Sequence, residues 1–279
     1  MFQINRVAAK KTFENYVNQF DTRDDKVRLK IEHTARVTAL CERIAKSLGL
    51  PEDDVNLAWM MGLLHDVGRF EQLKDFGTFN DAQSIDHAKY GVKLLFDDGH
   101  IRDYLADESC DNLIRTAIWN HNVFRMPEEL NKRELLFCQI LRDADKIDIL
   151  RVNVEIPIET IYNCTTEELK NATVTEAVLQ SFAEEHAVEH CLKRTPVDHV
   201  VGHASLVFEL VYPISICIVE EQGYLEKILS FQSNNSKTKA QFEQIAQIMK
   251  AFLEKANCAM GIVSNQITDT FINFFSVIQ

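Results

Sequence analysis

Residues 55–69 of the chain read Val-Asn-Leu-Ala-Trp-Met-Met-Gly-Leu-Leu-His-Asp-Val-Gly-Arg. The part over residues 55–64 is apolar almost all round, which is typical of a helix buried at the centre of a bundle. His65 and Asp66 follow at its end, and we expect Gly68 to stop the helix, because glycine is the usual residue just beyond a helix terminus. The stretch therefore predicts a buried helix that ends on an imidazole and a carboxylate.

The segments on both sides of this stretch are also helical in pattern. Apolar residues recur every three or four positions over residues 27–48, 85–96, 113–118 and 136–144. A loop is expected over residues 232–239 and a polar helix over residues 240–256. Glycine (9) and proline (5) are too scarce for the tight turns of an all-β protein. We predict an all-α fold, one domain over residues 1–279, with its chemistry in the first 150 residues.

Composition excludes several classes of protein. The 279 residues are 46% apolar, which is too much for a disordered chain, and the net charge of −12 disfavours duplex nucleic acid as a partner. The seven cysteines form no C-x-x-C pair and do not resemble a secreted disulfide scaffold. Residues 200–219 are apolar but contain His203, Glu209 and Pro213, so we expect one buried helix rather than a membrane span. With no signal peptide at the N-terminus, a cytoplasmic location is expected.

Several histidines and aspartates fall in line with the apolar stripes. His33 precedes Val37 by one turn, His121 follows Ile118 within one turn, and Asp145 follows Leu141 by one turn. An ionised aspartate inside a helical core is costly unless it is paired or binds a cation. One such residue alone would favour an ordinary buried, hydrogen-bonded side chain. Two aspartates and three histidines together favour a shared divalent metal.

These residues also resemble the signature of a known family. His33, then His65-Asp66 in Gly62-Leu-Leu-His-Asp-Val-Gly-Arg69, then Asp145 in Asp143-Ala-Asp-Lys-Ile-Asp148, is similar to the H…HD…D pattern of the HD-domain metal-dependent phosphohydrolases. The resemblance covers residues 20–155 and implies a helix bundle with a metal site at its centre. It implies that Asp145 is the ligand and that Asp148 orients a neighbouring side chain. Residues 156–279 are then a helical extension that forms a wall of the site, a lid or an oligomer contact.

His87 and His121 extend this resemblance to the six-ligand H…HD…H…H…D variant. It implies that Asp66 bridges two metals and that His87 and His121 hold the second one. The alternative is that these two histidines bind substrate phosphate while a single metal is held. The expected cofactor is one or two divalent ions of Mn, Fe, Co, Ni, Zn or Mg. The predicted metal ligands are His33, His65, Asp66, His87, His121 and Asp145.

The resemblance implies hydrolysis of a small phosphorylated molecule, with a nucleotide as the expected substrate. Water activated by the metal would attack phosphorus, with Asp66 as a catalytic residue and with Arg69 and Lys146 stabilising the developing charge. Arg125 is a weaker candidate for that role, and Gln72, Asn120 and Asn122 are weaker candidates as hydrogen-bond donors. Two alternatives stay open: a di-iron oxygenase with the same ligands, and a non-catalytic nucleotide-binding regulatory protein. A homodimer is one expected assembly. The apolar segment 262–279 is expected to pack either on the body of the protein or on a partner subunit.

A second histidine pattern favours no site. His186-Ala-Val-Glu-His190 matches the H-x-x-E-H pattern of one class of zinc protease. Glu184, Glu185 and Glu189 surround it, so we interpret it as a solvated acidic helix face. His199 and His203 are interpreted as core or lid histidines.

Overall fold

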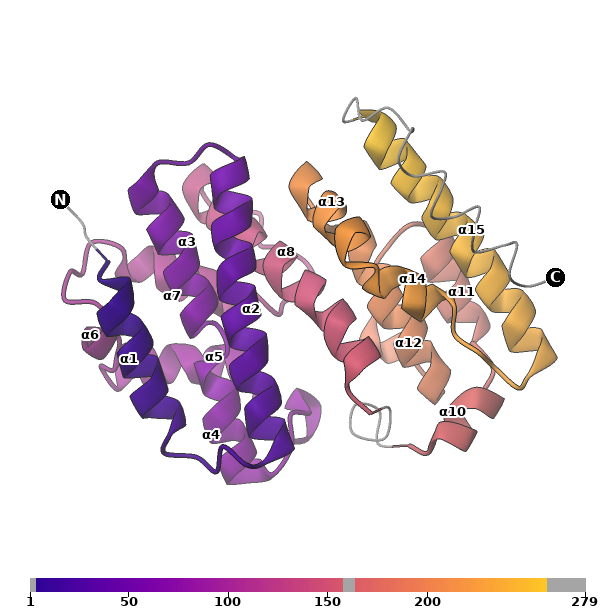
Figure 1. Ribbon diagram of the computed structural model, residues 1–279, viewed down its shortest axis with the longest axis horizontal. Helices are drawn as coiled ribbons and strands as arrows, with labels where there is room; N and C mark the ends of the chain where they lie inside the picture. The colour runs from indigo at the N-terminus through magenta and orange to yellow at the C-terminus, as the bar shows by residue number, and fades with distance from the viewer. Residues whose placement is uncertain (1–3, 158–163, 260–279) are drawn as a thin grey trace. The chain divides into compact units, whose positions relative to one another are not determined.

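The computed structural model describes residues 4–157 and 164–259, which are helical with no strand among them. The predicted all-α class is confirmed. The chain divides into two compact units, Met1–Val152 and Asn153–Gln279 (Figure 1). No helix within the described ranges is both long enough and apolar enough to cross a membrane.

The first unit is a bundle built around α2 (Asp25–Ser47) and α3 (Glu52–Leu64), which lie side by side (Figure 1). Their close crossing depends on Gly62, because a Cβ atom there would lie 2.7 Å from Thr38 Cα. Every residue from Leu57 to Leu64 is buried, as the sequence predicts for a central helix. The other elements of this unit are α1 (Arg6–Val17), α4 (Val67–Phe76), η1 (Asp81–Gln83), α5 (His87–Val92), the π-helix η2 (Lys93–Asp97), α6 (Ile101–Tyr104), α7 (Asp111–Trp119) and α8 (Lys132–Glu155), which ends in the second unit.

The chain leaves helical geometry at Asp66, between α3 and α4, with φ −108° and ψ 15°, whereas His65 before it still has helical backbone angles. The prediction that Gly68 stops the buried helix is wrong, because Gly68 lies inside α4. Its missing side chain serves packing instead: a Cβ atom would lie 2.3 Å from the carbonyl oxygen of His87 and 2.6 Å from the amide nitrogen of Gly91. Gly68 thus allows α4 to approach the start of α5 backbone to backbone. Asp66 occupies the N-cap position of α4 but makes no capping hydrogen bond.

The second unit is a separate set of packed helices. Its elements are α10 (Thr166–Asn171), α11 (Glu176–Ala183), η3 (His190–Leu192), α12 (Pro196–Ala204), η4 (Ser205–Glu209), α13 (Pro213–Gln222), α14 (Tyr224–Leu229) and α15 (Ser236–Ala259). The prediction of one helix over residues 200–219 is wrong. That stretch divides into α12, η4 and α13, because Pro213 has no amide hydrogen and begins a new helix.

Two further expectations concern this unit. The polar helix predicted over residues 240–256 lies within α15, which begins four residues earlier, at Ser236. The apolar segment 262–279 lies outside the described residues. A role of residues 156–279 as wall, lid or oligomer contact stays a prediction.

Candidate metal centre

Four side chains from three places in the first unit converge on one point. His33 comes from α2, His65 and Asp66 from the break between α3 and α4, and Asp145 from α8. The Nε2 atom of His33 lies 3.0 Å from Asp145 Oδ1, 3.4 Å from His65 Nε2 and 3.6 Å from Asp66 Oδ2. The Nε2 atom of His65 lies 3.5 Å from the same Asp66 oxygen. We call these four residues the first ligand group.

A second group meets the other oxygen of Asp66. His87 begins α5, and His121 follows the end of α7. Their Nε2 atoms are 2.9 Å apart and lie 3.5 Å and 3.8 Å from Asp66 Oδ1. Asp66 therefore presents one oxygen to each group, and its side chain is 3% exposed. The structure thus brings together all six residues that the sequence pattern singled out.

The other nitrogen of each ring is already bonded. His33 Nδ1 lies 2.8 Å from an Asp148 oxygen and His87 Nδ1 lies 2.6 Å from an Asp81 oxygen. His65 and His121 face the backbone carbonyl oxygens of Gly62 and Ile118 at 2.8 Å and 2.7 Å. Carbonyl and carboxylate oxygens accept hydrogen bonds, so in a neutral ring the proton sits on Nδ1 and the Nε2 lone pair is free. In neutral rings the Nε2 lone pairs of His33 and His65 lie close together, and so do those of His87 and His121, and a cation beside each pair would stabilise this arrangement.

Burial keeps three of these rings neutral at physiological pH. Burial lowers the pKa of His87 and of His121 to about 4, and the nearby Arg69 guanidinium adds to this effect at His87. Burial also lowers the pKa of His65. His33 differs: burial and Lys30 oppose its protonation, but the hydrogen bonds to Asp145 and Asp148 outweigh them and raise its pKa.

The two carboxylates of the cluster are ionised. Burial opposes the charge on Asp66, yet Lys30 and the neighbouring histidines hold the pKa of this carboxyl well below its usual range. Burial likewise opposes the charge on Asp145, and the hydrogen bond from His33 lowers its pKa. Neutral imidazoles and ionised carboxylates form the mixed donor set that divalent transition metals bind. The residues present therefore fit a divalent metal, and the identity and number of the ions stay predictions.

Asp148 holds the ring of His33 from behind. Its side chain is fully buried and accepts hydrogen bonds from Arg36 Nε and Arg151 Nε, each at 2.8 Å, in addition to the His33 contact. The expectation that Asp148 orients a neighbouring ligand is consistent with these contacts. Residues that orient metal-binding histidines fix both the tautomer and the direction of the ring.

We expect Asp148→Asn to weaken metal binding without unfolding the protein. The amide keeps the shape of the side chain but removes the charge that orients His33, so metal affinity should fall by about 10–100-fold. A competition titration against a fluorescent chelator measures this change. Arg36→Gln is the matched control, since it contacts Asp148 from the exposed side and should change affinity far less. An affinity equal to wild type in Asp148→Asn would show that His33 does not need this partner.

The segment before α5 is organised by Asp81, a residue that the sequence pattern did not indicate. One oxygen of Asp81 bonds His87, and the other accepts from Arg69 Nη1 at 2.7 Å and from Gln72 Nε2 at 2.9 Å. Arg69 Nη1 also bonds the carbonyl oxygen of Phe79 and the Gln72 side chain. Arg69 and Gln72 thus position Asp81, and through it His87.

Lys30 is the second residue that the sequence analysis missed. Its Nζ atom lies 2.7 Å from Asp66 Oδ2, and its side chain is 16% exposed. Its spacing from His33 could have indicated this role, because a residue three positions before His33 lies on the same face of the helix. On the other side of Asp66, Arg69 Nε lies 3.8 Å from Oδ1 and is buried with no hydrogen-bond partner among the residues that the structure describes.

The remaining candidates take other roles or stay untested. Asn120 bonds the carbonyl of Thr116, Asn122 bonds Asp86, and Arg125 is exposed beside the Phe124 ring. Lys146 follows Asp145 in α8, and its role with phosphate stays a prediction. Arg142 was not expected: its Nη1 atom donates to the carbonyl oxygens of Asn120, His121 and Val123, and so holds the turn that carries His121.

The pattern at residues 186–190 forms no helical histidine pair. α11 ends at Ala183, so the predicted helix face is wrong, and His186 and His190 are both exposed. His199 and His203 lie in α12, in the second unit, and are partly buried. The clusters of the first unit are the ones that offer converging ligand atoms among the described residues.

Comparison with known proteins agrees with this geometry. A family model described as HD domain matches residues 31–150 of the chain. No curated protein and no solved structure matches the chain. The matched range holds all six residues of the two ligand groups. Residues 31–150 therefore match the HD-domain model, and the converging histidines and aspartates of this range are the candidate metal centre.

Proposed function

We propose that the protein is a metal-dependent phosphohydrolase that cleaves a phosphoester of a small molecule, with a nucleotide as the expected substrate. HD domains occur mostly in metal-dependent hydrolases. The observation that carries the proposal is Asp66, whose two oxygens face two separate sets of imidazole nitrogens. A carboxylate placed in this way suits a pair of metals that share it as a bridge.

The ligand groups define what each residue would hold. His33, His65, Asp66 and Asp145 would bind one ion, and Asp66, His87 and His121 would bind the other. When bound, divalent ions supply Lewis acidity and lower the pKa of water from 15.7 to about 7. The Nδ1 hydrogen bonds hold the four rings in place before any ion arrives, so little reorganisation is needed on binding.

Two cationic side chains lie on either side of Asp66 and would bind the phosphate group of the substrate. Lys30 lies on the side of the first ligand group and Arg69 on the side of the second. Both also lie against the ring of Phe79, with Lys30 Nζ 5.5 Å and Arg69 Cζ 5.8 Å from its centroid. Fixed positive charge at this position stabilises the charge that gathers on phosphoryl oxygens during transfer.

The test is a substrate screen on protein loaded in turn with each candidate metal. Release of inorganic phosphate or of a nucleoside from a panel of nucleotides and other phosphoesters is expected, and it should stop when a chelator removes the metal. Two outcomes would contradict the proposal. Paired iron with oxygen consumption and no phosphoester cleavage would favour an oxygenase. A full complement of metal with no turnover on the panel would favour a regulatory module.

We expect Lys30→Met to impair substrate use while metal is retained. The Lys30 ammonium competes with a metal for Asp66 Oδ2, so its loss should not weaken metal binding. Loss of one charge-assisted hydrogen bond to phosphate costs about 1.5–3 kcal/mol, so kcat/KM should fall by about 10–150-fold. Steady-state kinetics and elemental analysis on the same sample measure both quantities.

Two further variants make that result specific. Lys30→Arg keeps a cation at the position and should recover part of the activity. Lys46→Met is the control, because Lys46 is an exposed residue of α2 that pairs with Glu42 away from the cluster. Parallel loss of metal and activity in Lys30→Met would mean that Lys30 supports the site structurally instead.

A further inference from the structure

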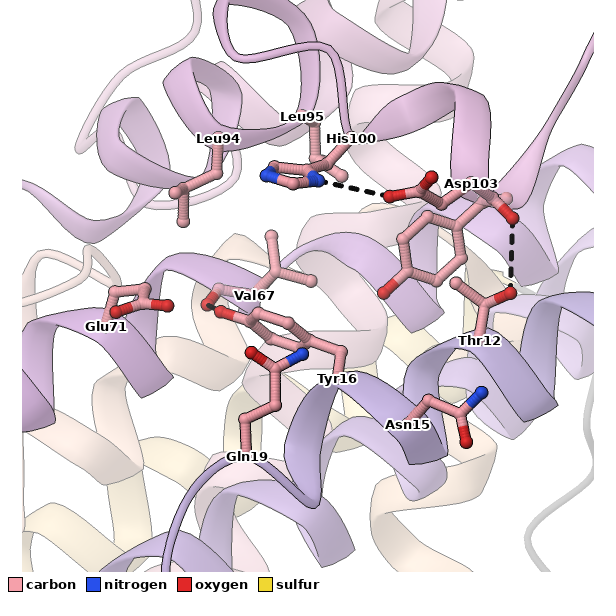
Figure 2. A pocket seen from close by; sticks show the side chains of 11 residues that line it. Thr12, Asn15, Tyr16, Gln19, Val67, Glu71, Leu94, Leu95, His100 and Asp103 are labelled. Carbon is pink, nitrogen blue, oxygen red and sulfur yellow. Dashed lines mark hydrogen bonds and ion pairs between the residues drawn. The ribbon is translucent and has the colours of Figure 1, made fainter.

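A cavity of about 330 Å³ lies in the first unit, among α1, α4, the π-helix η2 and α6 (Figure 2). None of the six candidate metal ligands lines it. Its α1 side precedes residue 31, where the HD-domain match begins, so the cavity extends outside the matched range. It is therefore a feature separate from the proposed catalytic centre.

The cavity lining combines apolar side chains with a few polar ones, the usual composition of a small-molecule site. Val67, Leu94 and Leu95 supply the apolar part of the lining, and Val67 and Leu95 are buried. Thr12, Asn15 and Gln19 come from α1 and the residues just after it. Figure 2 shows Leu94 above this space and Tyr16 below it, with Glu71 and Asp103 on opposite sides.

Two carboxylates and one histidine, His100, line the cavity. Glu71 and Asp103 line it, while none of the described residues that line it is a lysine or an arginine. Asp103 pairs with His100 at 3.1 Å. An anionic ligand would meet two carboxylates here with no fixed cation among the lining side chains. A phosphate group is therefore disfavoured, and a ligand of the opposite charge is favoured.

Glu71 is the stronger of the two anchors. Its side chain is 17% exposed, and its Oε2 atom lies 2.9 Å from the Nζ of Lys74, which is itself 62% exposed. Its Oε1 atom has no hydrogen-bond partner within the described parts of the chain. A largely buried carboxylate with an open acceptor is suited to receive an N–H donor.

The two tyrosines complete the cavity in different ways. The Tyr16 hydroxyl donates to the carbonyl oxygen of Val67 at 2.8 Å, so it is already used. The Tyr104 hydroxyl has no hydrogen-bond partner in the described ranges, and burial raises the pKa of this group, so it stays protonated. Tyrosine rings also attract cations to their faces.

We propose that this cavity binds a small organic cation. The ammonium group of the ligand lies beside Glu71 and the ring faces of Tyr16 and Tyr104. The hydrocarbon part of the ligand packs on Val67, Leu94 and Leu95. The Tyr104 hydroxyl hydrogen-bonds a polar group of the ligand. The site lies one residue along the chain from Asp66, because Val67 both lines the cavity and follows the bridging carboxylate.

The test uses three probes of the same size and different charge: benzylamine, benzyl alcohol and benzoate. Each is titrated into the whole protein and followed by amide NMR shifts. Benzylamine should bind saturably with a Kd at least about 10-fold lower than that of benzyl alcohol, and benzoate should not bind. Equal binding of the three probes, or no saturable binding of benzylamine, would overturn the proposal.

Matched variants locate the effect. Glu71→Gln keeps the shape of the side chain and should abolish the preference for benzylamine over benzyl alcohol. Tyr104→Phe should weaken benzyl alcohol, which bonds its hydroxyl. Glu14→Gln removes an exposed carboxylate of α1 that is not part of the lining, and it should leave all three affinities unchanged. A preference that survives in Glu71→Gln would place the binding elsewhere and contradict the assignment.

Discussion

Asp66→Asn is expected to remove bound metal and turnover together, while the helical fold survives. Both ligand groups depend on this carboxylate, because each oxygen faces one of them. Asparagine keeps the shape but offers one weak oxygen ligand and one amide that repels a cation. Bound metal should fall below about a tenth of wild type. Turnover should fall by about 1,000-fold or more, since metal ions supply several kcal/mol and each 1.36 kcal/mol is tenfold.

Elemental analysis, circular dichroism and phosphate-release kinetics on one preparation measure the three quantities. His65→Ala should give a similar loss, because it removes an imidazole nitrogen from the first group. His121→Ala should deplete the second group alone, which distinguishes two metals from one. Asp111→Asn is the control, since Asp111 is a carboxylate of the same unit that pairs with Arg102 and not with the cluster. Full activity in Asp66→Asn would refute the site assignment.

The sequence predicts site residues correctly where the position of a residue along a long helix determines the direction of its side chain. His33 and Asp145 follow the apolar stripes of long helices, and the structure brings their ligand atoms to 3.0 Å. His87 is harder, because it begins the six-residue helix α5 and lies one step off the apolar stripe. Its direction is fixed by the contact with Asp81, which no helical period describes.

Contacts between distant segments explain what the sequence does not predict. Lys30 reaches Asp66 across 36 positions, and Arg142 holds the turn after α7 from α8. Lysine and arginine are usually found on protein surfaces, so the sequence alone does not mark these two residues. Their roles depend on which helices pack against each other. The error at Gly68 has the same origin, since a glycine near a helix break and a glycine at a helix crossing look alike in one sequence.

Gly68→Ala is expected to lower stability and metal content in one step. The new Cβ would lie 2.3 Å from the His87 carbonyl oxygen, a backbone atom that cannot rotate away. Alanine gains about 1 kcal/mol in helix propensity, whereas overpacking costs about 1–3 kcal/mol and can cost more when backbone must move. The steric cost therefore exceeds the gain in helix propensity, and the variant is less stable. α5 must shift, and His87 moves with it, away from His121 and Asp66.

Gly91→Ala provides the matched comparison, because Gly91 faces Gly68 from the other helix. Its Cβ would meet Gly68 N at 3.3 Å and a Val67 methyl at 3.4 Å, which a small adjustment relieves. We expect stability within about 1 kcal/mol of wild type, since the helix-propensity gain and the mild crowding are of similar size and opposite sign. Thermal unfolding and metal content should thus separate the two alanine variants, with the larger loss in Gly68→Ala. Equal losses would mean that the close approach of α4 and α5 does not set the position of His87. Other contacts would then have to hold the second ligand group in place.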